Sequence, residues 1–261
     1  MAKRLDVRLV ELGLAPSRHQ AQALILAGQV RVNDRPATKA GQTIEDGDHV
    51  TVKESEHYVS RGAYKLLKAI EDFAIDLNEK ICLDVGASTG GFTQVMLEAG
   101  AKRIYSVDVG YGQFDYSLRQ NDRVVVLERQ NARHLTKEII PEAIDFFSMD
   151  VSFISVRLIL PAIKQLLADQ AEGVILIKPQ FEAGRDQVGK GVVTDPTIHQ
   201  EVITGILEYV KQQELFPLAL GYSPIKGPKG NREFLLYLAN TNQPHDEVDI
   251  DQVVRDAHRE L

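Results

Sequence analysis

The segment from residue 81 to 92 constrains the fold of this chain more than any other. It reads ICLDVGASTGGF, an apolar run that ends in an acid and then passes through three glycines. Apolar residues at helical spacing follow, at Val95, Met96 and Leu97, so the pattern predicts a buried strand, a tight loop and a helix. Glycine tolerates positive φ and lets a ligand approach the backbone, so the segment predicts a nucleotide-sized binding loop.

The spacing of the glycines discriminates between cofactors. Dinucleotide-binding loops favour G-x-G-x-x-G, whereas this loop reads D-x-G-x-x-x-G-G from Asp84. A second strand, 104–107, ends at Asp108, which follows Asp84 by 24 residues and suits a carboxylate that binds ribose hydroxyls. The pattern therefore favours S-adenosyl-L-methionine over NAD. The alternative is that both acids only cap the ends of strands.

Further strands are expected along the same chain. Residues 124–127 lead to a loop at 130–133 that we expect beside the adenosine, residues 144–149 deliver Asp150, and residues 174–177 deliver Lys178. Residues 158–167 are expected to form a crossover helix. Strands that alternate with helices predict a parallel α/β sheet, Rossmann-like, with its ligand at the carboxyl ends of the strands. The expected cofactor-binding residues are Asp84, Gly86, Ala87, Ser88, Gly90, Gly91, Phe92, Asp108, Val109, Asn131 and Asp150.

The composition excludes several classes. Cys82 is the single cysteine of 261 residues, so no disulfide forms within the chain and a reducing, cytoplasmic location is expected. We see no secretory signal at the N-terminus, and the central aliphatic run 174–177 is too short to span a bilayer. A membrane is therefore not expected as a partner. The seven histidines lack metal-ligand spacing, so a metal is not expected either.

The N-terminal segment differs in charge from the rest. Residues 1–53 hold eight Lys/Arg and six Asp/Glu, and the remainder holds 22 and 31. Leucines at helical spacing, a capping box at 17–20 and short alternating strands at 30–32 and 49–52 predict a small α+β unit. The expected division is a unit at 1–55, a linker at 56–61, a larger domain at 62–240 and an acidic tail at 241–261. The tail carries a helical apolar stripe, so it is expected to dock as a terminal helix.

Two resemblances follow from these motifs. The segment from Arg4 to Asp6, with Ser17-Arg18 and residues 25–33, resembles the S4 RNA-binding domain. That resemblance implies a basic face that binds structured RNA. The alternative is that these charged residues only form an ordinary solvated helix surface. The RNA-binding candidates are Arg4, Arg8, Arg18, His19, Gln22, Arg31 and Lys39, and, in the larger domain, Arg61, Arg185, Lys190 and Arg232.

Four distant charged residues, Lys65, Asp150, Lys178 and Glu233, resemble the Lys-Asp-Lys-Glu tetrad of ribose 2′-O-methyltransferases with the FtsJ/RrmJ-like fold. Over nearly its whole length, including segments 60–66, 84–92, 108–113, 150–155 and 178–182, the chain resembles the TlyA (hemolysin A) family. That resemblance implies methylation of cytidine 2′-hydroxyls in ribosomal RNA or ribosomal subunits, and some members carry the name hemolysin.

The chemistry explains these residue types. A ribose hydroxyl is a poor nucleophile, so its proton must be removed or the emerging alkoxide stabilised. Lys178 is expected either to act as the base, with Lys65 as its helper, or to stabilise the alkoxide as an ammonium, while Asp150 and Glu233 orient both lysines. Two ordinary ion pairs are the structural alternative. A glycine-rich loop at 184–191 is expected to close over the substrate.

Two other functions fit parts of the pattern. One is a non-catalytic RNA-binding or ribosome-assembly factor with a vestigial cofactor loop. The other is a membrane-active hemolysin, which only the family name suggests.

Overall fold

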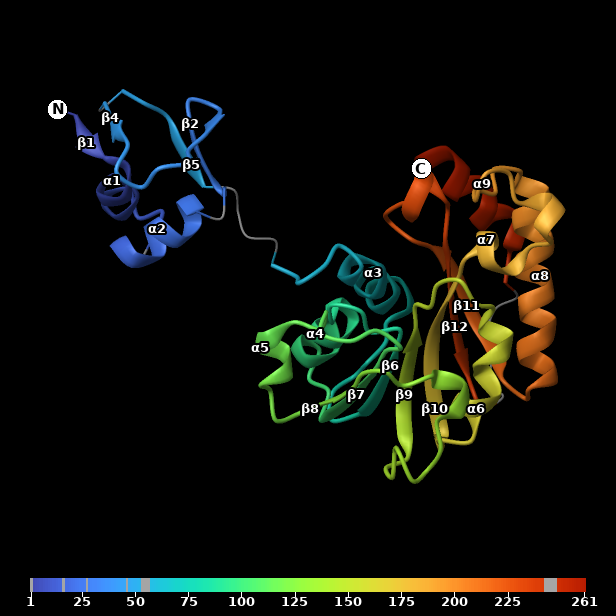
Figure 1. Ribbon diagram of the computed structural model, residues 1–261. Coiled ribbons are helices and arrows are strands. Elements are labelled where there is room, and N and C mark those ends of the chain that lie inside the picture. Colours follow the sequence, from blue (N-terminus) through green and yellow to red (C-terminus); the bar gives the residue numbers. More distant parts are fainter. Residues whose placement is uncertain (1, 16, 27, 46, 53–56, 242–247) are drawn as a thin grey trace. The chain divides into compact units, whose positions relative to one another are not determined.

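The computed structural model describes residues 2–15, 17–26, 28–45, 47–52, 57–241 and 248–261. The chain divides into two compact units, Met1–His57 and Tyr58–Leu261, which are described separately (Figure 1). The expected linker at 56–61 overlaps this division. Within it, Tyr58 and Val59 pack on the second unit, since the Tyr58 ring lies 5.6 Å from the Tyr64 ring and the Val59 N–H donates to Gln94 at 2.9 Å.

The first unit consists of two helices and two small antiparallel sheets. Strands β2, β3 and β5 form one sheet in the order β3-β2-β5, and β1 pairs with β4 in the other. Asn33 and Asp34 both have positive φ, as a tight two-residue turn between β2 and β3 requires. The bounds are β1 Lys3–Arg4, α1 Leu5–Glu11, α2 Arg18–Leu26, β2 Val30–Val32, β3 Arg35–Pro36, β4 Thr43–Ile44 and β5 Val50–Val52.

The core of this unit follows the apolar spacing of its sequence. Leu5, Leu9, Ala21 and Ile25 face the strands and are almost fully buried. The predicted cap is present, because the Gln20 N–H donates to Ser17 Oγ at 3.2 Å. The two-residue strands β1, β3 and β4 were not predicted, since so short a segment carries no period.

The second unit contains a seven-stranded sheet in the order β11-β12-β10-β9-β6-β7-β8. Strands β10, β9, β6, β7 and β8 pair in parallel, whereas β12 runs antiparallel to both β10 and β11. The Rossmann-like α/β class is confirmed, although a wholly parallel sheet is not. The strands are β6 Ile81–Val85, β7 Arg103–Val107, β8 Val124–Leu127, β9 Ile144–Met149, β10 Leu167–Ile177, β11 Phe216–Tyr222 and β12 Phe234–Ala239.

Helices cover both faces of this sheet (Figure 1). Successive strand residues point to opposite faces, so Phe146 packs beneath α3 and α4 while Phe147 packs on the side of α6 and α8. Among the described residues, no helix has the length and apolarity needed to cross a membrane. The helices are α3 Ala63–Phe73, α4 Gly91–Glu98, α5 Tyr116–Arg119, α6 Leu160–Lys164, α7 Pro179–Glu182, α8 Pro196–Gln212 and α9 Ile250–Glu260, with short 3-10 turns η1 Ala132–His134, η2 Val156–Leu158, η3 Arg185–Gln187 and η4 Pro228–Gly230.

The structure corrects the predicted crossover at 158–167. Only a short helix, α6, begins at Leu160 with Pro161 in its first turn, and Leu167 already belongs to β10, which is eleven residues long rather than the predicted four. Strand β11 was not predicted. It contains Pro217 and Gly221, which weaken the strand signal.

The terminal helix α9 docks on α8 and β11, as its apolar stripe predicts. Val254 and Ala257 are buried, and His258 Nε2 lies 2.9 Å from Nδ1 of the fully buried His199. The other ring nitrogen of His199 lies 3.1 Å from the Val193 carbonyl, which can only accept, so Nε2 carries the proton and Nδ1 accepts from His258. Burial lowers the pKa of His199 to about 4.

This buried histidine predicts a pH-dependent stability. His199 in the unfolded chain takes up a proton near pH 6.5, whereas the folded chain does so only near pH 4. The free energy of unfolding should therefore fall as the pH drops from 6.5 toward 4, by about 2 kcal/mol after allowance for screening. Denaturant titrations of wild type and His199→Gln from pH 7 to 4.5 isolate this contribution. The exposed His134→Gln serves as the control, and equal pH dependence in wild type and His199→Gln would contradict the prediction.

Candidate active site

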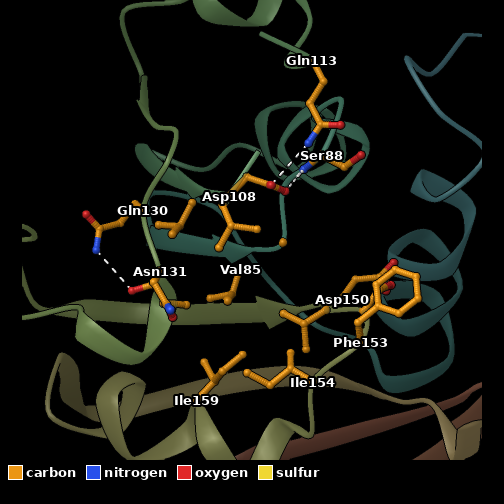
Figure 2. A pocket seen from close by; sticks show the side chains of 16 residues that line it. Val85, Ser88, Asp108, Gln113, Gln130, Asn131, Asp150, Phe153, Ile154 and Ile159 are labelled. Atoms are coloured by element: carbon orange, nitrogen blue, oxygen red, sulfur yellow. Dashed lines mark hydrogen bonds between the residues drawn. The ribbon is translucent and has the colours of Figure 1, made fainter. Parts of the chain in front are cut away.

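A cavity of about 540 Å³ lies at the carboxyl ends of β6, β7 and β9 (Figure 2). Its volume lies in the range of small-molecule sites. It is lined by the polar residues Ser88, Asp108 and Asn131 and by the apolar residues Val109, Ile154 and Ile159. The remaining lining residues are Val85, Gly86, Val107, Gln113, Gln130, Ala132, Asp150, Val151, Ser152 and Phe153.

The loop after β6 is held by Asp108. Its carboxylate accepts from the backbone N–H of Ser88 at 2.7 Å and from the Gln113 amide at 3.3 Å (Figure 2). It also accepts from the backbone N–H of Gly110 at 2.6 Å. One acid thus fixes the two loops that form the wall of the cavity. Of the segment 110–113, Gln113 lines the cavity.

The glycines of the loop are required mainly by packing within the protein. Gly86 has φ +86° and lines the cavity, but an added Cβ would lie 2.5 Å from the Asp150 carbonyl oxygen. A Cβ at Gly90 would lie 2.6 Å from Leu118, and one at Gly91 would lie 2.3 Å from Ser60. The sequence leads us to expect that Gly90 and Gly91 contact a ligand, but neither residue lines the cavity. Contacts within the protein are enough to require glycine at both positions.

Several expected cofactor residues lie away from the cavity. Asp84 is fully buried, and its carboxylate accepts from Thr93 at 2.7 Å and from Ser148 at 3.1 Å. Burial raises the pKa of Asp84 to about 6. Phe92, the second residue of α4, packs in the core, and Ala87 is buried too. Asp84 does not line the cavity, because its position in β6 turns the side chain into the core, so contact between Asp84 and a ligand stays a prediction. The expected residues that do line the cavity are Gly86, Ser88, Asp108, Val109, Asn131 and Asp150.

Four charged side chains meet beside the cavity. Asp150 lies between two ammonium groups, with Lys178 Nζ 2.6 Å from Oδ1 and Lys65 Nζ 3.1 Å from Oδ2. Lys65 Nζ also lies 2.7 Å from Oε2 of Glu233, which is fully buried. The structure thus brings together the tetrad that the sequence suggested, although 168 positions separate its first and last members.

The charges balance within this cluster. Burial opposes the charged form of Lys65, but Asp150 and Glu233 outweigh it and raise the pKa of Lys65. Burial likewise opposes the charged form of Asp150, yet the two lysines lower the pKa of this carboxyl. The charged forms of Lys65 and Asp150 are therefore favoured by their partners in the cluster, despite burial.

The sheet topology explains how the four residues converge. Asp150 and Lys178 follow the parallel strands β9 and β10, so both lie at the carboxyl edge. Glu233 precedes β12, which is antiparallel and pairs Phe234 with Ile177, so its first residues lie at that same edge. Lys65 reaches the group from the first turns of α3. Ser152, which the sequence analysis missed, accepts from Lys178 Nζ at 3.0 Å, and its position two residues after Asp150 was the available signal.

In the first unit, the RNA-binding candidates gather around a buried acid. Asp6 has no exposed surface and accepts from Arg4 Nε at 3.0 Å, Arg18 Nη2 at 3.2 Å and Gln22 Nε2 at 2.9 Å. The Arg4 guanidinium, with Gln22 and Arg18, holds the pKa of Asp6 far below its ordinary value. The other candidates of this unit, Arg8, His19, Arg31 and Lys39, lie at its surface, with Arg8 half-buried beside Glu11.

The candidates of the second unit differ in their surroundings. Arg61, Arg185 and Lys190 are exposed. Arg232 instead donates from Nε to the Ala257 carbonyl at 3.0 Å, so it holds the end of α9. RNA binding is therefore not needed to explain Arg232. Among the described residues, no group of three or more His, Cys, Asp or Glu side chains is placed to hold a metal ion.

Comparison with known proteins agrees with this arrangement. Residues 58–240 match the FtsJ-like methyltransferase model and residues 3–50 match the S4 domain model. These matches and the sheet define a methyltransferase of the S-adenosyl-L-methionine-dependent fold with an S4 domain. TlyA of Mycobacterium tuberculosis, named a 16S/23S rRNA (cytidine-2′-O)-methyltransferase, is 46% identical over 90% of this chain and 89% of its own length.

Two further proteins match over almost the whole chain. YqxC of Bacillus subtilis, which carries an rRNA methyltransferase name, is 44% identical over 99% of this chain and 95% of its own. A solved structure from Streptococcus thermophilus with a hemolysin name is 42% identical, with a TM-score of 0.77 over 99% of this chain and 96% of its own. The chain belongs to the TlyA (hemolysin A) family of rRNA methyltransferases.

The position of Glu233 depends on a glycine in the preceding turn. A Cβ at Gly227 would lie 2.2 Å from Glu233 Oε1 and 2.8 Å from Cδ, and the fully buried carboxylate cannot retreat. Gly227→Ala should lower the free energy of unfolding by about 1–3 kcal/mol, as overpacking does. Gly189→Ala is the control, because the nearest atom to its Cβ lies 3.9 Å away. Equal stability of the two variants in denaturant titrations would refute this packing argument.

Proposed function

We propose that the protein transfers a methyl group from S-adenosyl-L-methionine to the 2′-hydroxyl of a cytidine in ribosomal RNA. The observation that carries the proposal is the buried Lys65-Asp150-Lys178-Glu233 cluster, which lies beside a nucleoside-sized cavity at the carboxyl edge of the sheet. Ion pairs that served stability alone would not need to border a cavity. The activities for which two relatives are named, rRNA (cytidine-2′-O)-methyltransferases, support the same reaction and acceptor.

The cavity suits the donor through its own residues. We infer that Asp108 and Asn131 bind the ribose hydroxyls and that Val109, Ile154 and Ile159 enclose the adenine, since these side chains line the cavity. The donor supplies an electrophilic methyl group on a sulfonium. Asp150 lines the cavity and is also a member of the tetrad. We therefore infer that it lies next to the place where donor and acceptor meet.

The tetrad acts on the acceptor oxygen. A lysine ammonium has three N–H donors, and among the described residues Asp150 and Ser152 accept two of those of Lys178. The third is directed, in this proposal, at the ribose oxygen, where it stabilises the developing alkoxide. Lys65 and Glu233 complete the charge balance and hold Asp150 in place.

The first unit is proposed to bind structured ribosomal RNA. Arg4 and Arg18 expose 52% and 58% of their side chains while their inner nitrogens bond to Asp6. The guanidinium groups are thus oriented before binding, which reduces the entropy lost on contact with phosphate.

The tetrad is tested by Lys178→Ala. Transfer of labelled methyl to ribosomal subunits should fall on the order of 100- to 1000-fold, as when a donor to a developing oxyanion is removed. Calorimetric affinity for S-adenosyl-L-methionine should change less than about twofold, because Lys178 does not line the cavity. Lys164→Ala, on α6 and paired with Glu214, is the matched control. Transfer within tenfold of wild type would remove Lys178 from the mechanism.

Lys178→Arg separates the two roles open to Lys178. An arginine keeps the positive charge but cannot act as a base near neutral pH. Measurable transfer above that of Lys178→Ala supports electrostatic stabilisation. Transfer as low as that of Lys178→Ala, with wild-type cofactor affinity, favours the base.

The RNA-binding face is tested by Asp6→Asn. This change makes the unit more positive, so charge alone predicts tighter binding, whereas loss of the oriented guanidiniums predicts binding about three- to tenfold weaker. Asp34→Asn gives the same change of charge at an exposed turn of the same unit. Affinities for isolated ribosomal subunits, measured at fixed salt, decide whether net charge or the orientation of the guanidiniums matters more. Tighter binding by both variants would exclude a role for Asp6 in orienting the guanidiniums.

A further inference from the structure

Two chain segments carry the acceptor side of the site. Asp150 leads into the loop 151–155, and Lys178 leads into α7 (Pro179–Glu182). The catalytic ends of the segments meet where Lys178 Nζ lies 2.6 Å from Asp150 and 3.0 Å from Ser152. The geometry of the tetrad therefore depends on how these two segments are held against each other.

The far ends of the same segments are joined by Glu182. Its Oε2 accepts from Ser155 Oγ at 2.6 Å, and its Oε1 accepts from the Val156 N–H at 2.8 Å. Both oxygens of one half-buried carboxylate are thus bound to the loop that follows Asp150. Ser155 Oγ also accepts from the Arg157 N–H at 3.2 Å, so the hydroxyl that donates to Glu182 is itself held in place.

The loop between these contacts has an unfavourable backbone. Phe153 has φ +64°, a left-handed conformation that costs free energy for a bulky residue and persists only where the surroundings impose it. Its side chain is 91% exposed, and its ring lies 5.1 Å from that of Phe181 on α7. An exposed side chain does little to hold this backbone conformation of Phe153. We attribute it to the hydrogen bonds of Lys178 with Ser152 and of Glu182 with Ser155 and Val156, which flank Phe153 along the chain.

We propose that Glu182 is a positioning residue for methyl transfer. Its hydrogen bonds to Ser155 and Val156 close a ring of chain segments that consists of β9, loop 151–155, α7 and β10. The inference rests on the proposed function. Glu182 does not line the cofactor cavity, and its carboxylate accepts from Ser155 and Val156, so it acts through the loop that follows Asp150 and carries Ser152. A displacement of about 1 Å in such a group can lower a catalytic rate by about two orders of magnitude.

Two substitutions separate bridging from charge. Glu182→Ala removes both acceptors, and kcat for methyl transfer should fall about 10- to 100-fold while KM for ribosomal subunits and the affinity for S-adenosyl-L-methionine change less than about threefold. Glu182→Gln can still accept from Val156 and can donate to Ser155 Oγ, so its kcat should stay within about threefold of wild type. Glu208→Ala, on the exposed face of α8, is the control.

Hydrogen exchange gives a readout that does not need activity. The amides of residues 151–157 should exchange faster in Glu182→Ala and at the wild-type rate in Glu182→Gln. If the wild-type protein transfers no methyl group, the proposed function fails, yet exchange still decides whether Glu182 holds the loop. Unchanged exchange in Glu182→Ala, kcat within threefold of wild type in that variant, or equal loss of kcat in both variants would overturn the proposal.

Discussion

The second unit depends on one carboxylate that is shared by two ammonium groups. Asp150 lies within 3.1 Å of the Nζ atoms of both buried lysines, Lys65 and Lys178, and it favours the charged form of Lys65 despite burial. Glu233 supplies the second negative charge. A cluster of this kind is costly to desolvate and contributes little to stability for its cost, so its presence at a cavity indicates a functional origin.

The same arrangement recurs in the first unit with another purpose. Asp6 is buried between Arg4 and Arg18, whose guanidiniums remain about half exposed. In the second unit the acid orients cations that are themselves buried, which suits chemistry on a substrate atom. In the first unit the acid orients cations that face solvent, which suits contact with a polyanion.

Antiparallel pairing of one strand completes the tetrad. In a wholly parallel sheet the residue before a strand would lie at the amino edge, far from Asp150 and Lys178. Because β12 runs against β10, Glu233 lies at the carboxyl edge instead, next to Lys178 in the register that pairs Phe234 with Ile177. The turn at Gly227 then leaves room for its carboxylate.

The sequence by itself determined the alternation of strands and helices, the small N-terminal α+β unit and the strand ends at Asp108, Asp150 and Lys178, because these follow from local apolar period and glycine spacing. Only the tertiary structure decided where side chains point. It turned Asp84 into the core, assigned Arg232 to the end of α9, and gave Asp6 and Glu182 their partners. Such pairings join segments distant in sequence, and a hydrophobic pattern carries no information about contacts across the fold.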